Sequence, residues 1–468
     1  MDKFLIKPEK LFLILCLFWG LLLMLINPPF QASDENSHFW KVYSISQGHF
    51  NLKRLTTNFI DGVFFTRVYT GTGDYMPAGI YLAGYKNLRL RNNPEQKTSI
   101  EETKTILNYK LQKDTKVFNG YNVPVYTIFS YFPQAVVMKI CNVFNVNPGI
   151  SLYLMRCASL FVYCFLVYLA IKITPFKKWL FFMLALMPMS IYQAVSVNID
   201  GLLFACAFLS AAYVMYLGYD DKIKIIGKNQ KALLFLLMSF IVFSKAPYFP
   251  ILFIYFLIPQ YKFKNKTDYY KTFLCLILIN FFIIAGFKAY VSHVCMLTDT
   301  VFKTNLAYNL LISNPFAFLQ ITAYTTLMNL GSYINGFVGT FGWNDTPLPF
   351  YCVFIYILML VIHSVFNCEK DKKVYITRPF LFTAVFITVY FLIFAALFLA
   401  FQIDNKGMIG HFGGRYLIPA APVLFFAFLN NKFYLNNKYC NILNIASILL
   451  INFVLAVSVI RIVYRFYV

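Results

Sequence analysis

Residues 11–26 read LFLILCLFWGLLLMLI, and residues 27–40 continue as NPPFQASDENSHFW. The first run is uncharged and close to the length that an α-helix needs to cross the hydrocarbon core of a bilayer. Pro28 and Pro29 end that helix, because proline lacks the backbone N–H that a helix interior requires. Ser33 and Asp34 are residue types that begin a new helix as N-caps. The sequence therefore predicts a membrane helix followed at once by a short polar helix.

The composition of the whole chain fits a protein that lipid surrounds. Of 468 residues, 59% are hydrophobic and only 13% are charged, whereas soluble domains carry about 25% charged residues. A soluble fold of this length would need a polar surface that these residues cannot supply. The net charge of +22 does not indicate nucleic acid as a partner, because the lysines lie between apolar runs. We therefore expect the lipid bilayer, and no nucleic acid, around this chain.

Further apolar runs predict an all-α, polytopic transmembrane helix bundle of about 11 spans. Two of the runs, Ala232–Ser244 and Tyr248–Pro259, are short and share a break at Lys245, so they are either two thin helices or one broken helix. No small-residue cleavage site follows the first run, so we expect an uncleaved first span. The expected spans are Leu11–Ile26, Ile150–Ile173, Trp179–Ala194, Gly201–Leu217, Ala232–Ser244, Tyr248–Pro259, Thr272–Tyr290, Phe350–Phe366, Phe380–Phe401, Tyr416–Leu429 and Ile442–Ile460.

The distribution of cations gives the orientation. Lysine and arginine concentrate on the cytoplasmic loops of membrane proteins. With the N-terminus in the cytoplasm, the loops on that side hold Lys3, Lys7, Lys10, Lys177, Lys178, Lys222, Lys224, Lys228, Lys231, Lys262, Lys264, Lys266, Lys271, Lys370, Lys372, Lys373, Arg378, Lys432 and Lys438. The short outer loops hold only Lys245, Lys406 and Arg415. We expect a multi-pass protein of the bacterial cytoplasmic (inner) membrane with its active face outside the cytoplasm.

Two long segments, 27–149 and 291–349, fall on the outer face in this topology. The first contains a polar stretch, Lys86–Gly120, which predicts a small extramembrane lobe. It also contains the short apolar run Val125–Phe144, which predicts a helix lying on the membrane surface. The second contains Pro315–Leu330, which predicts another surface or re-entrant helix. Because these outer-face juxtamembrane pieces gather on one side, we expect function there.

Nothing in the sequence divides the chain further. No internal repeat is visible, so residues 1–468 are expected to form a single transmembrane domain. The ten cysteines lie mostly in apolar runs and include no C-x-x-C pair. We expect neither a disulfide framework nor a metal site from them.

The polar helix after the first span carries the first candidate site. Asp34 and Glu35 lie four and three residues before His38, so all three can share one helix face. Two adjacent acids and an imidazole can bind a divalent cation such as magnesium or manganese, or deprotonate a hydroxyl. The alternative is a capped interfacial helix whose acids only satisfy its N-terminal amides.

A second acid, Asp200, ends the run QAVSVNID at residues 193–200, between the third and fourth spans. The topology places it on the outer side, level with Asp34. Its alternative role is that of an N-cap for the fourth span. Asp345, in the run GWNDTPLP at residues 342–349, is a possible third acid, although a turn before a span explains it as well.

Three cations complete the set. Lys245 lies where two short spans meet, and a charge at that depth is usually paired or functional. Arg415 follows two glycines that let the backbone approach a ligand, and arginine binds phosphate in a bidentate manner. Arg156, near the outer end of the second span, is a similar cation. The alternatives are snorkelling for Lys245, a loop anchor for Arg415 and an intramembrane pair with an acid for Arg156.

Several of these runs together resemble a bacterial family of predicted multi-span membrane proteins that is catalogued as a domain of unknown function. The matching runs occur in the expected order over nearly the whole chain, except for Lys86–Gly120. They are Pro28–Phe39, Tyr43–His49, Gln193–Asp200, Lys245–Tyr248, Gly342–Pro349 and Gly414–Pro419.

That family is similar in layout to the GT-C superfamily of membrane glycosyltransferases. The resemblance implies an enzyme that passes a sugar from a polyprenyl-phosphate carrier to a cell-envelope glycan or glycolipid on the outer face. It implies that Asp34 is the catalytic acid, with Glu35 beside it, and that Asp200 assists with metal or acceptor. Some relatives have two acids where this chain has Asp200 alone. Substrate contacts are expected from His38, Arg156, Lys245, Tyr248, Asp345, Arg415 and Tyr416.

Two other classes of function stay open. A transporter or flippase of lipid-linked glycans would be expected to show paired half-sequences and helices broken at the midplane, and neither repeat nor midplane acid is evident. A non-catalytic partner in envelope polysaccharide assembly would tolerate loss of Asp34. The three readings therefore differ in what an Asp34→Asn variant does to the envelope glycan.

Overall fold

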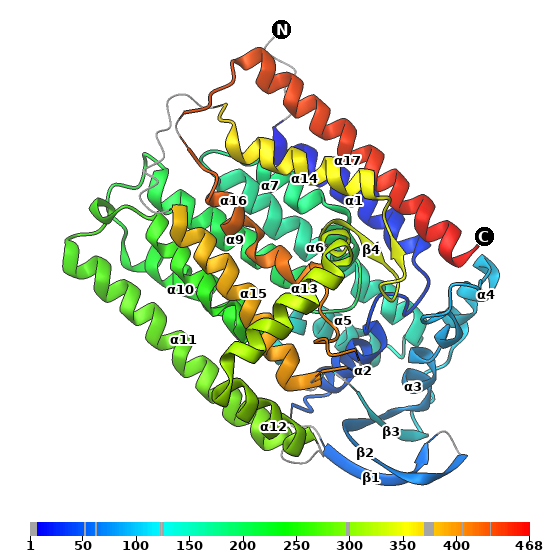
Figure 1. Ribbon diagram of the computed structural model, residues 1–468. Helices are drawn as coiled ribbons and strands as arrows, with labels where there is room; N and C mark the ends of the chain where they lie inside the picture. Colours follow the sequence, from blue (N-terminus) through cyan, green and yellow to red (C-terminus); the bar gives the residue numbers. More distant parts are fainter. Residues whose placement is uncertain are drawn as a thin grey trace.

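The computed structural model describes residues 7–50, 53–60, 63–121, 123, 126–295, 300–368, 379–401, 403–404, 406–430 and 432–468. The described chain is a bundle of helices with an extension of strands and short helices at one end (Figure 1). Some of the cations used for the predicted orientation lie outside the described residues: Lys3, Lys370, Lys372, Lys373 and Arg378.

Long apolar helices build the bundle. Within the described residues, six helices are long and apolar enough to cross a membrane: α1 (Pro8–Ile26), α6 (Pro148–Ile173), α9 (Asp200–Tyr219), α11 (Lys266–Cys295), α15 (Pro379–Phe401) and α17 (Asn437–Phe466). Shorter apolar segments accompany them: η4 (Ala246–Leu257), α14 (Phe350–Val365), η6 (Gly414–Ala420) and α16 (Ala421–Phe426). The chain is therefore a multi-pass helical membrane protein, and the count of about 11 spans stays a prediction.

Helix α9 forms the centre of the bundle. It is buried along almost its whole length, whereas α11 and α15 leave most of their surface exposed. It packs against α6, α10 (Lys228–Ser244) and η4. Small residues such as Ala205, Ala207 and Ala211 let neighbouring helices approach it closely. Because Asp200 is the first residue of α9, that acid stands at the end of the most buried helix.

Two of the expected spans are interrupted. The run Trp179–Ala194 forms α7 (Lys178–Leu186) and α8 (Pro188–Ala194), because the proline that opens α8 cannot continue the hydrogen bonds of α7. The second interruption is at Lys245, whose backbone is extended (φ −151°, ψ 110°) between α10 and η4. Since η4 packs back against α10, these two segments are separate short helices.

A three-stranded antiparallel sheet lies beyond the bundle, which the all-α prediction did not include. Strand β1 (Lys53–Ile60) pairs with β2 (Val63–Pro77), and β2 pairs with β3 (Lys116–Gly120). In this register Ile60 faces Val63 and Gly73 faces Gly120. A search for long apolar runs does not find such strands, because threonines and charged residues interrupt their apolar residues.

Short helical elements fill the predicted polar lobe between β2 and β3. They are α3 (Ala78–Gly84), η1 (Leu88–Leu90), α4 (Ile100–Lys104) and η2 (Thr105–Asn108). The chain then continues through η3 (Ile128–Tyr131) into α5 (Phe132–Val143).

Helix α5 exposes an apolar face. Phe132, Val136, Ile140 and Val143 are exposed, and residues spaced by about four positions share one face of a helix. A helix with an apolar outer face suits the headgroup level of a bilayer. The placement of this run on the membrane surface stays a prediction.

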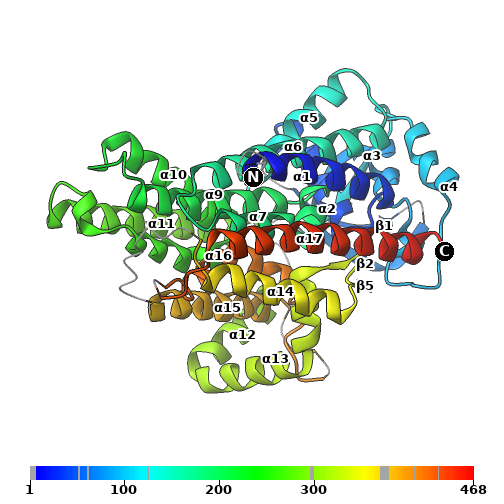
Figure 2. The same ribbon diagram turned by 90° about the horizontal axis from the view of Figure 1, so that it is seen from above.

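Helices α12 (Thr300–Ser313) and α13 (Pro315–Val338) stand to one side of the bundle (Figure 2). Helix α13 leads into a small two-stranded hairpin of β4 (Thr340–Phe341) and β5 (Thr346–Pro347). The short helix η5 (Gln260–Lys262) connects η4 to α11.

The expectation that the cysteines form no disulfide is wrong. Cys368 and Cys440 are disulfide-bonded across a sequence separation of 72 residues. A backbone bridge brings them together, since Asn367 N donates to Phe433 O at 2.9 Å and Leu435 N donates to Asn367 O at 2.9 Å. The spacing of Cys368 and Cys440 in the sequence does not indicate this disulfide, because only the packing of α14 beside α17 brings the two residues together.

Helix α17 runs along the bundle from the end where α1 begins to the end where the lobe lies (Figures 1 and 2). At its end, Arg465 donates to the backbone oxygen of Leu90 at 2.7 Å and to Gln96 O at 3.3 Å, both in the lobe. Arg465 also binds the Asp345 carboxylate at 2.7 Å. One side chain therefore ties α17, the lobe and the β4–β5 hairpin together.

Candidate functional site

Asp34 follows α1 directly and is the N-cap of α2 (Glu35–Ser46). Its backbone is left-handed (φ 61°, ψ 8°), which costs energy for a residue that has a Cβ. Its carboxylate does not cap the helix, and it makes no hydrogen bond or ion pair with any residue that the structure describes. The side chain is partly exposed. A carboxylate without a hydrogen bond or ion pair to the described residues therefore stands on strained backbone just after the end of α1.

Both carboxylate oxygens of Glu35, the next residue in sequence, accept hydrogen bonds from the protein. One of its oxygens accepts hydrogen bonds from Arg156 Nε at 2.8 Å and Val197 N at 3.0 Å. The other accepts from Arg156 Nη2 at 2.5 Å and Phe30 N at 3.1 Å. A carboxylate has about four acceptor positions, so Glu35 has none left for a substrate. Glu35 and Arg156 therefore position the segment after α1, and the acid-pair alternative for Arg156 is the one observed.

Asp200 pairs with two cations from distant elements. Lys245 Nζ lies 2.6 Å from Asp200 Oδ1, and Arg415 Nε lies 3.5 Å from Asp200 Oδ2. Asp200 is the first residue of α9 and not its N-cap. Asn198 Oδ1 accepts from Asp200 N at 2.8 Å and from Gly201 N at 3.3 Å. One carboxylate facing two cations leaves this cluster with a net positive charge.

The Asp34 segment and the Asp200 cluster lie side by side. Val197, three residues before Asp200, donates its backbone hydrogen bond to the residue after Asp34. Burial raises the pKa of Tyr126 to about 12, and the carboxylates of Asp200 and Asp34 both add to this rise while Lys245 opposes it. The two acids therefore act on the same tyrosine.

His38 stands one turn into α2 and faces this cluster. Its Nδ1 lies 2.6 Å from the hydroxyl of Tyr131, and its ring stacks on Tyr126 with centroids 5.7 Å apart. Burial lowers the pKa of His38 to about 3; the Asp200 carboxylate opposes that shift, and Lys245 is among the cations that support it. The imidazole is therefore neutral at ordinary pH and serves as a hydrogen-bonding group.

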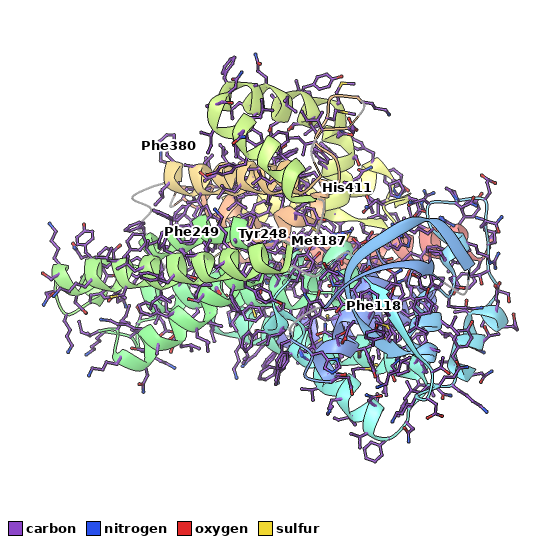
Figure 3. The ribbon with its side chains drawn as sticks, turned by 90° about the horizontal axis from the view of Figure 1, so that it is seen from below. Phe118, Met187, Tyr248, Phe249, Phe380 and His411 are labelled. Atoms are coloured by element: carbon purple, nitrogen blue, oxygen red, sulfur yellow. A yellow bond between two sulfur atoms is a disulfide. The ribbon has the colours of Figure 1, made fainter. Side chains whose placement is uncertain are left out.

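Tyr248 and Tyr416, which were both expected to bind substrate, connect the segments that carry Lys245 and Arg415. Tyr248 donates its hydroxyl to the backbone oxygen of Tyr416 at 2.8 Å. The ring of Tyr416 lies 4.9 Å from Lys245 Nζ, within the range of a cation–π contact. Tyr248 is buried, and in Figure 3 it lies between Phe118 of the small sheet and Phe380 of α15. The two tyrosines thus join η4 to η6 beside the cluster.

The hairpin between β4 and β5 covers the Asp34 segment. Ser33 Oγ donates to Gly342 O at 3.2 Å, and Trp343 Nε1 donates to Phe30 O at 3.3 Å. Asn344 Oδ1 lies 3.5 Å from Arg415 Nη1. Asp345 points elsewhere, because both of its contacts with cations are made with Arg465. The predicted third acid is therefore not in the cluster, and its neighbour Asn344 is.

Sequence reasoning missed Tyr126, Tyr131, Asn344 and Lys41. Lys41 lies one turn after His38, is buried, and donates to Val123 O at 2.8 Å and to Tyr126 O. Burial lowers the pKa of Lys41 to about 7. In the sequence, Lys41 is one lysine among many and the tyrosines are part of an abundant aromatic content. Only the three-dimensional packing separates them from the rest.

Two of the three residues proposed to hold a divalent cation are already paired with protein cations. Glu35 is saturated by Arg156 and two amides, and Asp200 is paired with Lys245 and Arg415. Among the described residues, no group of three or more His, Cys, Asp or Glu side chains is placed to hold a metal ion. The present arrangement of Asp34, Glu35 and Asp200 does not fit a metal site.

The bundle and this cluster define a multi-pass helical membrane protein whose polar residues gather beside one end of its central helix. Residues 17–424 match the model of the family described as predicted membrane protein DUF2142, and the chain belongs to that family. No curated protein and no solved structure matches the chain.

Proposed function

We propose that this chain is a membrane glycosyltransferase that moves a sugar from a polyprenyl-phosphate donor to a cell-envelope glycan or glycolipid on the extracytoplasmic face. The observation that carries the proposal is the free carboxylate of Asp34 beside the positive Asp200, Lys245 and Arg415 cluster. A base and an anion-binding group side by side are what transfer from a phosphate leaving group requires.

Asp34 acts as the general base. It takes the proton of the acceptor hydroxyl, whose oxygen then bonds to the anomeric carbon of the sugar. The bond between that carbon and the phosphate oxygen breaks, and its electron pair leaves with the lipid phosphate. The Asp34 carboxylate makes no hydrogen bond or ion pair with the described residues, which supports this role, because a carboxylate held in a salt bridge is a poor base.

Lys245 and Arg415 stabilise the phosphate as its negative charge grows. Arg415 is buried, and its Nε has no hydrogen-bond partner among the residues that the structure describes. A buried donor without an acceptor costs about 1 to 3 kcal/mol, and a phosphate oxygen would remove that cost. Neutral His38 and Asn344 add hydrogen-bonding groups for sugar hydroxyls. A divalent cation would have to displace Lys245 or Arg415 from Asp200, so we assign it no step.

An Asp34→Asn variant tests the proposal. The envelope glycans of cells lacking the protein would be compared after complementation with wild type, Asp34→Asn, or Asp114→Asn, a control acid exposed in the lobe. We expect Asp34→Asn to lower transfer by about 10² to 10⁴-fold at normal membrane levels, and Asp114→Asn to restore the glycan. A normal glycan with Asp34→Asn would refute the enzyme and favour a transport or assembly role.

A further inference from the structure

Two cavities lie side by side next to the cluster and share a wall. The first, of about 260 Å³, is lined by Lys41 and Tyr126 at one end and by Gly286 of α11 at the other. The second is an apolar groove of about 880 Å³ between α5, α6, α9, α10 and α11. Phe129 and Phe243 line both, with ring centroids 5.6 Å apart. The two spaces therefore adjoin at these two rings. We call the two adjoining spaces the path toward Tyr126, which lines the smaller one.

The groove lies along α6, α9 and α11, which are long and apolar enough to cross a membrane. On α10 its lining extends from Phe243 to Leu236, seven residues or about 10 Å along the helix at 1.5 Å per residue. Its other lining groups, such as Phe161 and Val162 of α6, are almost all apolar. A hydrocarbon chain would suit such a groove, because every lining side chain except Ser239 is apolar.

The inner end of the path has the opposite chemistry. The ring of Tyr126 lies 5.5 Å from Lys245 Nζ and stacks on His38. Lys41, whose amine donates to two backbone oxygens, also lines the 260 Å³ cavity. Cations beside an apolar groove match a molecule with a long hydrocarbon chain and an anionic head.

We propose that the hydrocarbon chain of a lipid phosphate lies in the groove between α5, α6, α9, α10 and α11, with its phosphate at Tyr126 beside Lys245. This inference rests on the proposed function and assigns the side from which its lipid donor approaches. A second groove, of about 870 Å³, lies between the lobe and the ends of α1, α6 and α17. Its floor includes Tyr153, which packs on Arg156, and the saturated Arg156–Glu35 pair separates it from the cluster. That groove is therefore not the donor path.

Gly286 offers a direct test. A Cβ on Gly286 would meet open space, so phenylalanine at 286 fills the cavity without a clash with the protein. Gly331 of α13 is also helical, exposed and open, and it lies on no part of either cavity, so Gly331→Phe is a matched control. Binding of a radiolabelled long-chain polyprenyl phosphate to the purified full-length protein would be measured for each variant. We expect Gly286→Phe to weaken binding at least tenfold and Gly331→Phe to leave it unchanged.

Further measurements separate this inference from the proposed function. Asp34→Asn should bind the polyprenyl phosphate like wild type while its glycan transfer is lost. If Gly286→Phe and the exposed groove variant Val136→Trp both bind like wild type, the groove assignment is wrong, although Asp34 can still be the base. Equal losses with Gly331→Phe, or equal displacement of the probe by phosphatidylglycerol, would also overturn it, because the groove would then be an ordinary bilayer contact.

Discussion

Asp34 and Glu35 are neighbours in sequence, but their surroundings give them different roles. Glu35 is buried and accepts four hydrogen bonds, whereas Asp34 is partly exposed and accepts none from the described residues. The sequence predicted both as catalytic because it shows residue types and spacing alone. It could not show that Arg156, 121 residues later, binds only one of the two.

The buried pair should matter for stability more than for chemistry. Removing one charge of a buried pair leaves the other uncompensated and costs about 3 to 5 kcal/mol. We expect Glu35→Gln to lower unfolding stability by about that amount, measured by denaturation in detergent. Glu102→Gln, which breaks the exposed Arg89–Glu102 pair, should cost under about 1 kcal/mol. Equal stability of Glu35→Gln and wild type would contradict the structural role.

His38 should make the protein sensitive to acid. Its native pKa of about 3 lies below the ordinary value of 6.5, so between these values the unfolded chain binds a proton that the native protein does not. The His38 contribution is therefore complete above about pH 6.5 and falls as the pH is lowered toward 3. We expect Tm in detergent to drop less between pH 7.5 and 4.5 for His38→Gln than for wild type. Identical drops would show that His38 is not held neutral.

At the scale of elements, the sequence predicted the helices well and the sheet poorly. Pro28 and Pro29 marked the end of α1, and the apolar runs located the long helices. The segment 53–77 is rich in β-branched and aromatic residues and contains Asp61-Gly62, a dipeptide typical of hairpin turns. A search for long apolar runs does not detect such a hairpin.

Element η6 places Arg415 through a close contact with α13. A Cβ on Gly414 would lie 1.9 Å from Tyr333 O, whereas a Cβ on Gly413 would have its nearest neighbour at 3.7 Å. Gly414→Ala must therefore move η6 and the guanidinium, and a shift of about 1 Å at a reacting group costs about 10²-fold in rate. We expect Gly414→Ala to lower glycan transfer by about that factor and Gly413→Ala to leave it nearly unchanged. Comparable activity of both alanine variants would show that this contact does not set the position of Arg415.

At the scale of the whole molecule, the positions of the predicted site residues in sequence say little about their positions in space. Asp200, Lys245 and Arg415 come from α9, the α10–η4 junction and η6, and helix packing brings them together. The predicted topology puts all three on one side of the membrane, and that placement stays a prediction. It also led to the inclusion of Asp345, which packing directs toward α17 instead.

The contact between Arg465 and Leu90 spans 375 residues of sequence. A ribosome that adds about 5 to 20 residues per second needs roughly 20 to 75 s to synthesise that interval. During this time the lobe is made but lacks its attachment to α17, so it is open to proteases and chaperones on its side of the membrane. An affinity tag fused just after α17 would lie next to this late-forming contact between Arg465 and Leu90. A tag placed before α1 would leave the contact undisturbed.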